Sequence, residues 1–271
     1  MKLTKHPMNT GFDWQDRQGP FKLITDAQAA QYNNQGFFVL ENVFSAEEIA
    51  AVEAAIDPLE QQTEAFLRTQ ADGKLFIAQA DQITFTINCV LHNEVLKRFT
   101  QHNVFADLCH DLMGPDCRLY WDQAVYKKPE PEREFPWHQD NGYTFVSPQQ
   151  YLTCWVALTD ATEDNGCPWV VPNVHREGTY EHWMTDMGWR CVDDDEGSAL
   201  CAPVKAGGIV VFSSLTPHRT GPNKTSGIRK AYIAQFAPDG AALIQPDGSS
   251  TMCDDPARQY HVVKDGAPVA A

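Results

Sequence analysis

The sequence predicts an α+β protein, in which helices pack outside a mostly antiparallel β-sheet or barrel. Two observations lead to this prediction. Helical signals gather in the first third of the 271-residue chain, and from Arg118 onward short β-rich runs alternate with turn residues. These runs lie at 118–127, 151–158, 168–171, 208–213 and 229–236.

The helical signals are specific enough to place individual elements. Thr25 with Gln28 and Ser45 with Glu48 have the spacing of capping boxes, in which two side chains satisfy free amides at a helix start. We therefore expect helices to begin at both places, and Pro58 to interrupt the second helix. A short strand is expected at 36–40, and further helical packing at 94–113.

Length and composition favour a single domain over 1–271. The chain is 43% hydrophobic and 11% aromatic, which is enough to build a sizeable core. We expect a loose leader at 1–20 and a tail at 239–271. Residues 178–200 fit neither the helical nor the strand period and are first aromatic and then acidic, so we expect an insertion that covers a site.

Charge and cysteine usage exclude several classes of protein. The 21 basic and 36 acidic side chains give a formal charge of −15, which repels nucleic acid and anionic membrane surfaces. No apolar run approaches the roughly 20 residues of a membrane helix, and the N-terminus lacks a secretory pattern. The eight cysteines include no Cys-x-x-Cys pair and are expected to be free thiols, so a cytoplasmic location is predicted.

Three side chains point to a metal centre. His138 and Asp140 are two residues apart, and on a strand they would project to the same face. His218 directly follows the apolar run 208–213. Two histidines and one carboxylate form the facial triad of non-haem Fe(II) oxygenases. The alternative is that His138 is a core histidine that donates a hydrogen bond to Asp140.

Arg229 strengthens the metal hypothesis. It lies eleven residues after His218, beyond a turn rich in glycine and proline, at the start of another strand-like run. On a neighbouring antiparallel strand an inward guanidinium would lie near the metal, where its planar fork suits a carboxylate.

With these residues in place, the chain resembles the phytanoyl-CoA dioxygenase family of Fe(II)/2-oxoglutarate-dependent oxygenases. The resemblance covers roughly residues 25–238. Besides the metal motif, the matching segments are Gly36–Leu40, Phe44–Glu48, Tyr120–Gln123, Lys128-Pro129, Leu152–Asp160, Asn165-Gly166, Val171-Pro172 and His175. At Asn173 and Val174 the chain departs from the glycine and serine that are usual in the family, which concerns the local turn.

The resemblance implies a double-stranded β-helix (jelly-roll, cupin-like) core with the N-terminal helices packed on one sheet. It also implies Fe(II), 2-oxoglutarate as cosubstrate and O2. By the same resemblance His138, Asp140 and His218 are the iron ligands, and they are the catalytic centre. Arg229 and Thr220 would hold the distal carboxylate of 2-oxoglutarate. The remaining residues that it suggests are Trp155 and Gln123 for the cosubstrate pocket, and His175 for structural hydrogen bonding without a metal.

The expected activity is hydroxylation of an unactivated C–H bond in a small, apolar or cyclic molecule, with release of succinate and CO2. A role in natural-product biosynthesis is the favoured setting. The presence of Asp140 argues against halogenation, because related halogenases lack this carboxylate. The alternatives are an acyl-CoA hydroxylase of the same family, a non-redox cupin-like metal- or ligand-binding protein, a metal-free scaffold and a zinc hydrolase. The oligomeric state is left open.

Overall fold

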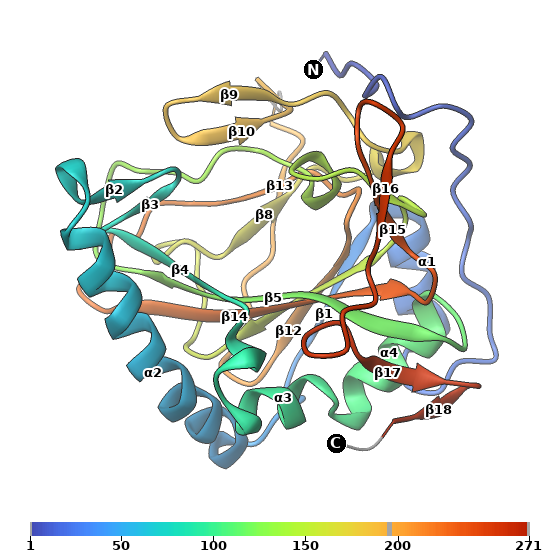
Figure 1. Cartoon of the computed structure of the whole chain (residues 1–271), viewed down its shortest axis with the longest axis horizontal. Helices are drawn as coiled ribbons and strands as arrows, with labels where there is room; N and C mark the ends of the chain where they lie inside the picture. Colours follow the sequence, from blue (N-terminus) through green and yellow to red (C-terminus); the bar gives the residue numbers. More distant parts are fainter. Residues whose placement is uncertain (1, 194–196, 270–271) are drawn as a thin grey trace.

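The computed structural model describes residues 2–193 and 197–269 of the chain. Its α-helices lie mostly in the first half of the sequence and cover one side of the molecule (Figure 1). They are α1 (Asp26–Gln35), α2 (Ala46–Arg68), α3 (Glu94–Thr100) and α4 (Asn103–Leu112).

The main sheet has ten strands with antiparallel pairing throughout. Its central path is β1-β12-β7-β14-β5-β4-β3-β2, and β17 and β18 join it beside β5. These strands are β1 (Phe37–Leu40), β2 (Lys74–Leu75), β3 (Ala78–Gln79), β4 (Ile83–Ile87), β5 (Cys117–Lys127), β7 (Leu152–Ala157), β12 (Ile209–Ser213), β14 (Arg229–Pro238), β17 (His261–Lys264) and β18 (Ala267–Pro268).

Three smaller sheets complete the structure. A three-stranded sheet in the order β11-β8-β13 lies across from the main sheet and contributes to the same inner core. The remaining sheets are β16-β15-β6 and the hairpin β10-β9. Their strands are β6 (Val146–Ser147), β8 (Pro168–Val170), β9 (Trp183–Thr185), β10 (Gly188–Arg190), β11 (Leu200–Cys201), β13 (His218–Thr220), β15 (Ala242–Ile244) and β16 (Ser250–Met252).

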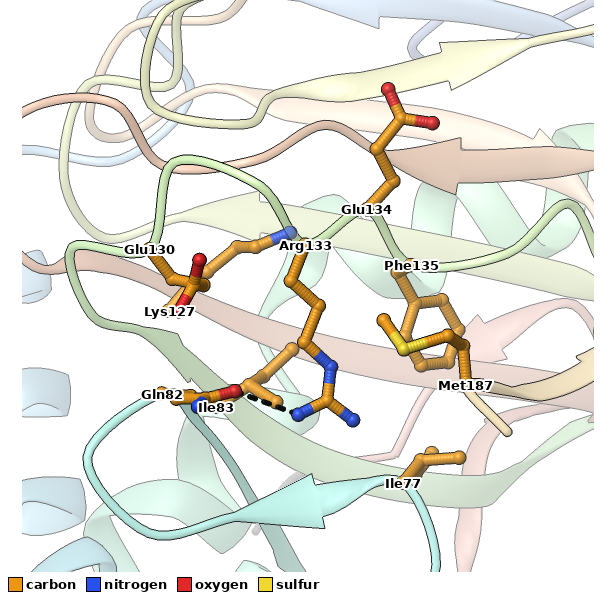
Figure 2. A pocket seen from close by; sticks show the side chains of 9 residues that line it. All are labelled: Ile77, Gln82, Ile83, Lys127, Glu130, Arg133, Glu134, Phe135 and Met187. Carbon is orange, nitrogen blue, oxygen red and sulfur yellow. Dashed lines mark hydrogen bonds between the residues drawn. The ribbon is translucent and has the colours of Figure 1, made fainter. Parts of the chain in front are cut away.

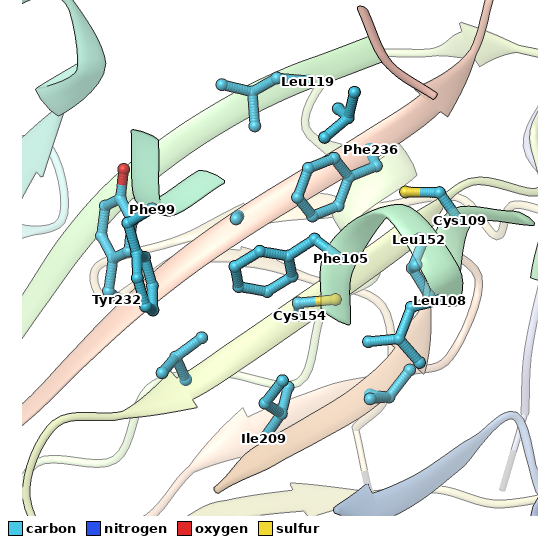
Figure 3. Packing of buried hydrophobic residues seen from close by; sticks show 14 of the residues in the cluster. Phe99, Phe105, Leu108, Cys109, Leu119, Leu152, Cys154, Ile209, Tyr232 and Phe236 are labelled. Carbon is cyan, nitrogen blue, oxygen red and sulfur yellow. The ribbon is translucent and has the colours of Figure 1, made fainter. Parts of the chain in front are cut away.

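The outer face of the main sheet forms the larger hydrophobic core. Side chains from α3 and α4, such as Phe99 and Phe105, pack on β14 and β7 (Figure 3). Because neighbouring side chains on a strand point to opposite faces, Tyr232 and Phe236 reach this outer core, whereas Ile233 faces the inner one. Two facing sheets around an inner core, with helices on one outer side, are the predicted jelly-roll arrangement.

The predicted helix starts are confirmed. Thr25 and Ser45 are the N-caps of α1 and α2, and both capping boxes are formed. The expected interruption at Pro58 is wrong, since α2 continues for 23 residues to Arg68. The second half of α2 is fixed to the sheet by buried carboxylates: Glu60 accepts a hydrogen bond from Thr84 Oγ1 (2.9 Å). These contacts outweigh the one backbone hydrogen bond that a proline removes.

The N-terminal segment is irregular but packed against the body of the protein. Trp14 is buried, and its ring lies edge-on to His175 with 4.4 Å between centroids. Asn9 donates hydrogen bonds to the carbonyls of Glu177 and Thr179. The expected loose leader is therefore held in place, because apolar and amide side chains within it find partners in the fold.

The segment expected as an insertion contains the β9-β10 hairpin (Figure 1). Residues 194–196 of its acidic part lie outside the described residues. Across the part of the chain that the structure describes, no helix combines the length and the apolar character needed to span a membrane.

Candidate metal centre and cosubstrate site

The structure brings His138, Asp140 and His218 together. One ligand atom from each of them lies within 4.8 Å of the others. The placement differs from the sequence expectation: His138 forms an isolated antiparallel bridge with His218, and Asp140 begins a single 3-10 turn at Asp140–Gly142. The sequence predicts that His138 and Asp140 share one face of a regular strand. Instead, the two backbone hydrogen bonds of the bridge (3.0 and 2.8 Å) bring His138 and His218 together.

Both imidazoles are oriented by backbone carbonyls. The Nδ1 of His138 lies 2.9 Å from the carbonyl oxygen of Pro136, and the Nδ1 of His218 lies 3.0 Å from that of Thr216. An Nδ1–H that donates to a carbonyl leaves Nε2 as the free lone pair, which is the form that binds a metal. Burial lowers the pKa of His138 to about 3 and that of His218 to about 4, so both rings are neutral at physiological pH.

Asp140 is held by a hydroxyl from the main sheet. Thr153 on β7 donates from Oγ1 to Oδ2 of Asp140 (2.6 Å). Gln235 on β14 in turn donates from Nε2 to Oγ1 of Thr153 (3.4 Å). The other carboxylate oxygen, Oδ1, faces the Nε2 atoms of His138 (4.0 Å) and His218 (3.7 Å). One oxygen is thus fixed by the protein while the other is turned toward the imidazoles, which suits a metal ligand.

Among the described residues Arg229 is the largest fully buried side chain, and all three of its guanidinium nitrogens lack a hydrogen-bond partner. Its Cζ lies 5.1 Å from the centre of the Trp155 ring, which supports one face of the guanidinium. Burial lowers the pKa of Arg229 to about 10, so the group stays charged at neutral pH. A buried charge without a partner is costly, and a bound carboxylate would remove that cost.

Thr220 and Gln123 lie on strands that border the same interior. Thr220 ends β13 and is two residues after His218, and its carbonyl accepts a hydrogen bond from the backbone N–H of Phe135 (2.9 Å). Gln123 on β5 pairs across with Ile233 of β14, an inner-core residue. Its side-chain oxygen accepts a weak hydrogen bond from the Trp121 indole (3.4 Å).

Figure 2 shows a pocket whose wall includes Phe135, a neighbour of the cluster. Phe135 lines it and lies edge-on to the His138 ring at 4.9 Å. Ile77, from the turn between β2 and β3, and Met187, from the turn between β9 and β10, contribute apolar surface, and Lys127 and Arg133 contribute cations. The pocket therefore offers both apolar and basic side chains close to His138.

Tyr143 also lies edge-on to the His138 ring, with 5.3 Å between the ring centroids. Its hydroxyl is buried without a hydrogen-bond partner, and burial raises its pKa. A methyl group on Gly188 of the β9-β10 hairpin would lie 3.8 Å from this hydroxyl, so the hairpin passes directly over it.

Other positioning residues were missed in the sequence. Gln139, between His138 and Asp140, is fully buried and donates to the carbonyls of Leu215 (2.6 Å) and Gly178 (3.1 Å). Thr153 and Lys127 also carried no recognisable signal, because single polar residues in apolar strands are common. His175 behaves as expected, with its Nε2 3.2 Å from the Asn33 carbonyl.

The fold and the cluster of two histidines and one carboxylate place the chain in the class of Fe(II)- and 2-oxoglutarate-dependent dioxygenases. The profile of the family described as "Phytanoyl-CoA dioxygenase (PhyH)" matches residues 32–231. The chain belongs to this phytanoyl-CoA dioxygenase family.

Known proteins agree with this assignment. The chain is 24% identical over 258 residues to the phytanoyl-CoA dioxygenase domain-containing protein 1 of Danio rerio, covering 78% of this chain and 89% of the relative. The solved carbocyclase SnoK from nogalamycin biosynthesis has a TM-score of 0.67 at 21% identity, over 83% of this chain and 89% of that one. EctD from Sphingopyxis alaskensis, solved with 2-oxoglutarate and 5-hydroxyectoine, also has a TM-score of 0.67 at 21% identity, over 92% of this chain and 87% of that one. At these identities the solved structures establish the shared jelly-roll fold.

Proposed function

We propose that His138, Asp140 and His218 hold the Fe(II) ion of this dioxygenase. The observation that supports this most directly is the convergence of their ligand atoms within 4.8 Å, with both Nδ1 atoms turned to backbone carbonyls. When bound, Fe(II) with 2-oxoglutarate and O2 supplies the oxidation of a C–H bond, with release of succinate and CO2.

The protein's own residues orient the reactants. Arg229 pairs with the distal carboxylate of 2-oxoglutarate, with Thr220 beside it and Trp155 against the guanidinium. Gln123 borders the same cavity from β5. Thr153 fixes the orientation of the Asp140 carboxylate, so that the ligand geometry is set before the metal binds.

The β9-β10 hairpin excludes water from the reaction centre. Gly188 lies against Ile77 and Pro136, and the Lys74 ammonium donates to the Asp186 carbonyl (3.0 Å), which links the hairpin to the β2-β3 turn. We therefore assign 178–200 as the cover of a single dioxygenase domain that spans 1–271.

The substrate is a small molecule with an apolar or cyclic part, and hydroxylation is the reaction. The pocket surface from Ile77, Phe135 and Met187 supports this choice. The SnoK neighbour is a carbocyclase from nogalamycin biosynthesis, and EctD was solved with 2-oxoglutarate and 5-hydroxyectoine, which favours a natural-product or related small-molecule substrate. The net charge of −15 disfavours a CoA thioester, nucleic acid or an anionic membrane, and we propose a cytoplasmic location.

An anaerobic titration tests the metal assignment. Fe(II) and 2-oxoglutarate together should give the wild-type protein a weak visible charge-transfer band that neither gives alone. Asp140→Ala should lose the band and all succinate formation under O2, because two imidazoles alone hold the ion weakly. A matched control is Asp160→Ala, an exposed carboxylate that pairs with Lys205, and it should keep both signals. An intact band in Asp140→Ala would contradict the assignment.

The same succinate assay identifies the substrate class. Cyclic and apolar candidate molecules should accelerate succinate release above its slow rate without substrate. Acceleration by acyl-CoA alone would replace our substrate class with the acyl-CoA alternative and would leave the metal assignment in place.

A further inference from the structure

Lys127 is a buried lysine that has no role in the proposed metal centre. It is the last residue of β5 and pairs directly across with Arg229, the first residue of β14. Directly paired residues on antiparallel strands project to the same face of the sheet. Since Arg229 points into the interior, Lys127 does so as well, and both side chains are about as inaccessible to solvent as any in the protein.

The partners of Lys127 are uncharged. Its ammonium donates to the carbonyl of Gly221 and lies 3.5 Å from that of Thr220. Within residues 2–193 and 197–269, neither Lys127 nor Arg229 forms an ion pair with a carboxylate. An ammonium has three donors, so one N–H beyond these two carbonyls remains for a ligand. Lys127 also lines the pocket of Figure 2, which makes it reachable.

The charges around Lys127 work against its ionisation. Burial and then the charge of Arg229 lower the pKa of Lys127 to about 7. Glu134 and Glu130 oppose this shift and Arg133 adds to it, all three from the loop that follows β5. On the β14 side Arg229 itself is flanked by the Cys167 thiol. Two cations held this close in a dry interior need an anion.

We propose that Lys127 and Arg229 together bind the distal carboxylate of 2-oxoglutarate. This inference rests on the proposed function of Arg229 and adds a residue to it. The geometry accounts for both unsatisfied groups at once: a carboxylate between them would accept hydrogen bonds from the guanidinium and from the free ammonium N–H. Thr220, the third member of the expected carboxylate site, belongs to the same turn that Lys127 contacts through its backbone carbonyl.

Binding of the cosubstrate is then linked to a proton. Above about pH 7 the free protein carries Lys127 mostly in its neutral form. A carboxylate placed beside the ammonium stabilises the charged form and raises its pKa, so binding takes up a proton. The affinity for 2-oxoglutarate should therefore fall as the pH rises above about 7, by at most about tenfold per pH unit.

Lys127→Met tests the proposal, and Lys128→Met is the matched control. Lys128 is the next residue and points to the other side of the sheet, where its Nζ pairs with Glu64 of α2 (2.8 Å). 2-Oxoglutarate is titrated into each anaerobic Fe(II)-loaded protein at about pH 6.5 and about pH 8.5, bracketing the lowered pKa. Lys127→Met should bind about tenfold more weakly at the lower pH and lose the pH dependence. Lys128→Met should behave as wild type.

2-Oxobutyrate, which lacks the distal carboxylate, separates ligand binding from a structural role. Its affinity should be the same in wild type and Lys127→Met. Equal weakening of both keto acids would mean that Lys127 only holds the Thr220–Gly221 turn, and would overturn the proposal. Unchanged 2-oxoglutarate affinity in Lys127→Met would overturn it too.

Calorimetry on the wild type gives a test that does not depend on a folded variant. At about pH 8, binding of 2-oxoglutarate in two buffers of different ionisation enthalpy should reveal more proton uptake than binding of 2-oxobutyrate. Equal proton uptake for the two ligands would contradict the role of Lys127. If the wild type bound neither keto acid, the proposed function itself would be wrong, and the two failures are thus distinguishable.

Discussion

The two faces of the main sheet each carry a hydrophobic core but differ in their polar groups. On the outer face, Phe105 and Phe236 pack among apolar side chains, and the buried Asp122 accepts hydrogen bonds from Tyr232 Oη (2.9 Å) and Val90 N (3.2 Å). On the inner face, none of the three guanidinium nitrogens of Arg229 has a hydrogen-bond partner. The same strands supply both faces, because side chains alternate along them.

This difference separates stability from function. Asp122 on the outer face has its hydrogen-bond partners within the protein, so it needs no ligand. Under the proposed function, the buried Arg229 guanidinium on the inner face lowers the stability of the ligand-free protein and gains its partner when 2-oxoglutarate binds. Opposite effects of substitutions on the two faces would establish this division.

Phe236→Ala tests the outer face and should have the largest effect on stability. Removal of a fully buried phenylalanine ring leaves a cavity against α4 and should lower the free energy of unfolding by about 3–5 kcal/mol. Urea unfolding monitored by circular dichroism measures the change. The affinity for 2-oxoglutarate in the folded variant should stay at the wild-type value, and a large loss of affinity would show that the two faces are not independent.

His138 and His218, which lie against the inner core, should make stability depend on pH. His138 and His218 have pKa values lowered to about 3 and about 4, so the unfolded chain takes up their protons first as the pH falls below about 6.5. Stability is therefore lost on acidification, by about 2–3 kcal/mol from these two groups between about pH 7.5 and about pH 5.5.

The titration of the Asp140 carboxyl group would mask part of this effect, so it has to be eliminated by substitution. Burial raises the pKa of Asp140, so its titration opposes that of the histidines, and metal-free Asp140→Asn is the variant to use. Adding His218→Phe should reduce the pH dependence by about half, since one of two titrating groups is gone. A pH dependence that is unaffected by this change would assign the effect to other groups.

Arg229→Met should have the smallest effect on stability, and the opposite sign. It removes a buried charge without a partner, and the metal-free protein should become about 1–2 kcal/mol more stable to urea. Its affinity for 2-oxoglutarate should fall by about a hundredfold or more, because a buried charge-assisted pair is lost. A destabilised variant with unchanged cosubstrate affinity would identify Arg229 as a structural residue instead.

Local signals predicted much of the fold. The capping boxes placed the starts of α1 and α2, and the apolar run 208–213 closely matched β12. Errors arose where tertiary contacts override local preference. Pro58 does not end α2, because Glu60 and Glu64 beyond it bind the sheet. The β9-β10 hairpin was not recognised, since three-residue strands show no clear period.

By itself the sequence determined the kinds of ligand and their order along the chain. The side chains of His138, Asp140, His218 and Arg229 have the chemistry that suits a metal ion and a dicarboxylate. Their identity and spacing can be read from the sequence alone. It also determined the alternation that divides each central strand between two cores.

Only the tertiary structure decided which distant residues meet. The pairing of β5 with β14 sets Lys127 opposite Arg229, and β7 brings Thr153 to Asp140. These contacts depend on strand register, and register is fixed by the packing of whole faces against each other, so no local stretch of sequence specifies it.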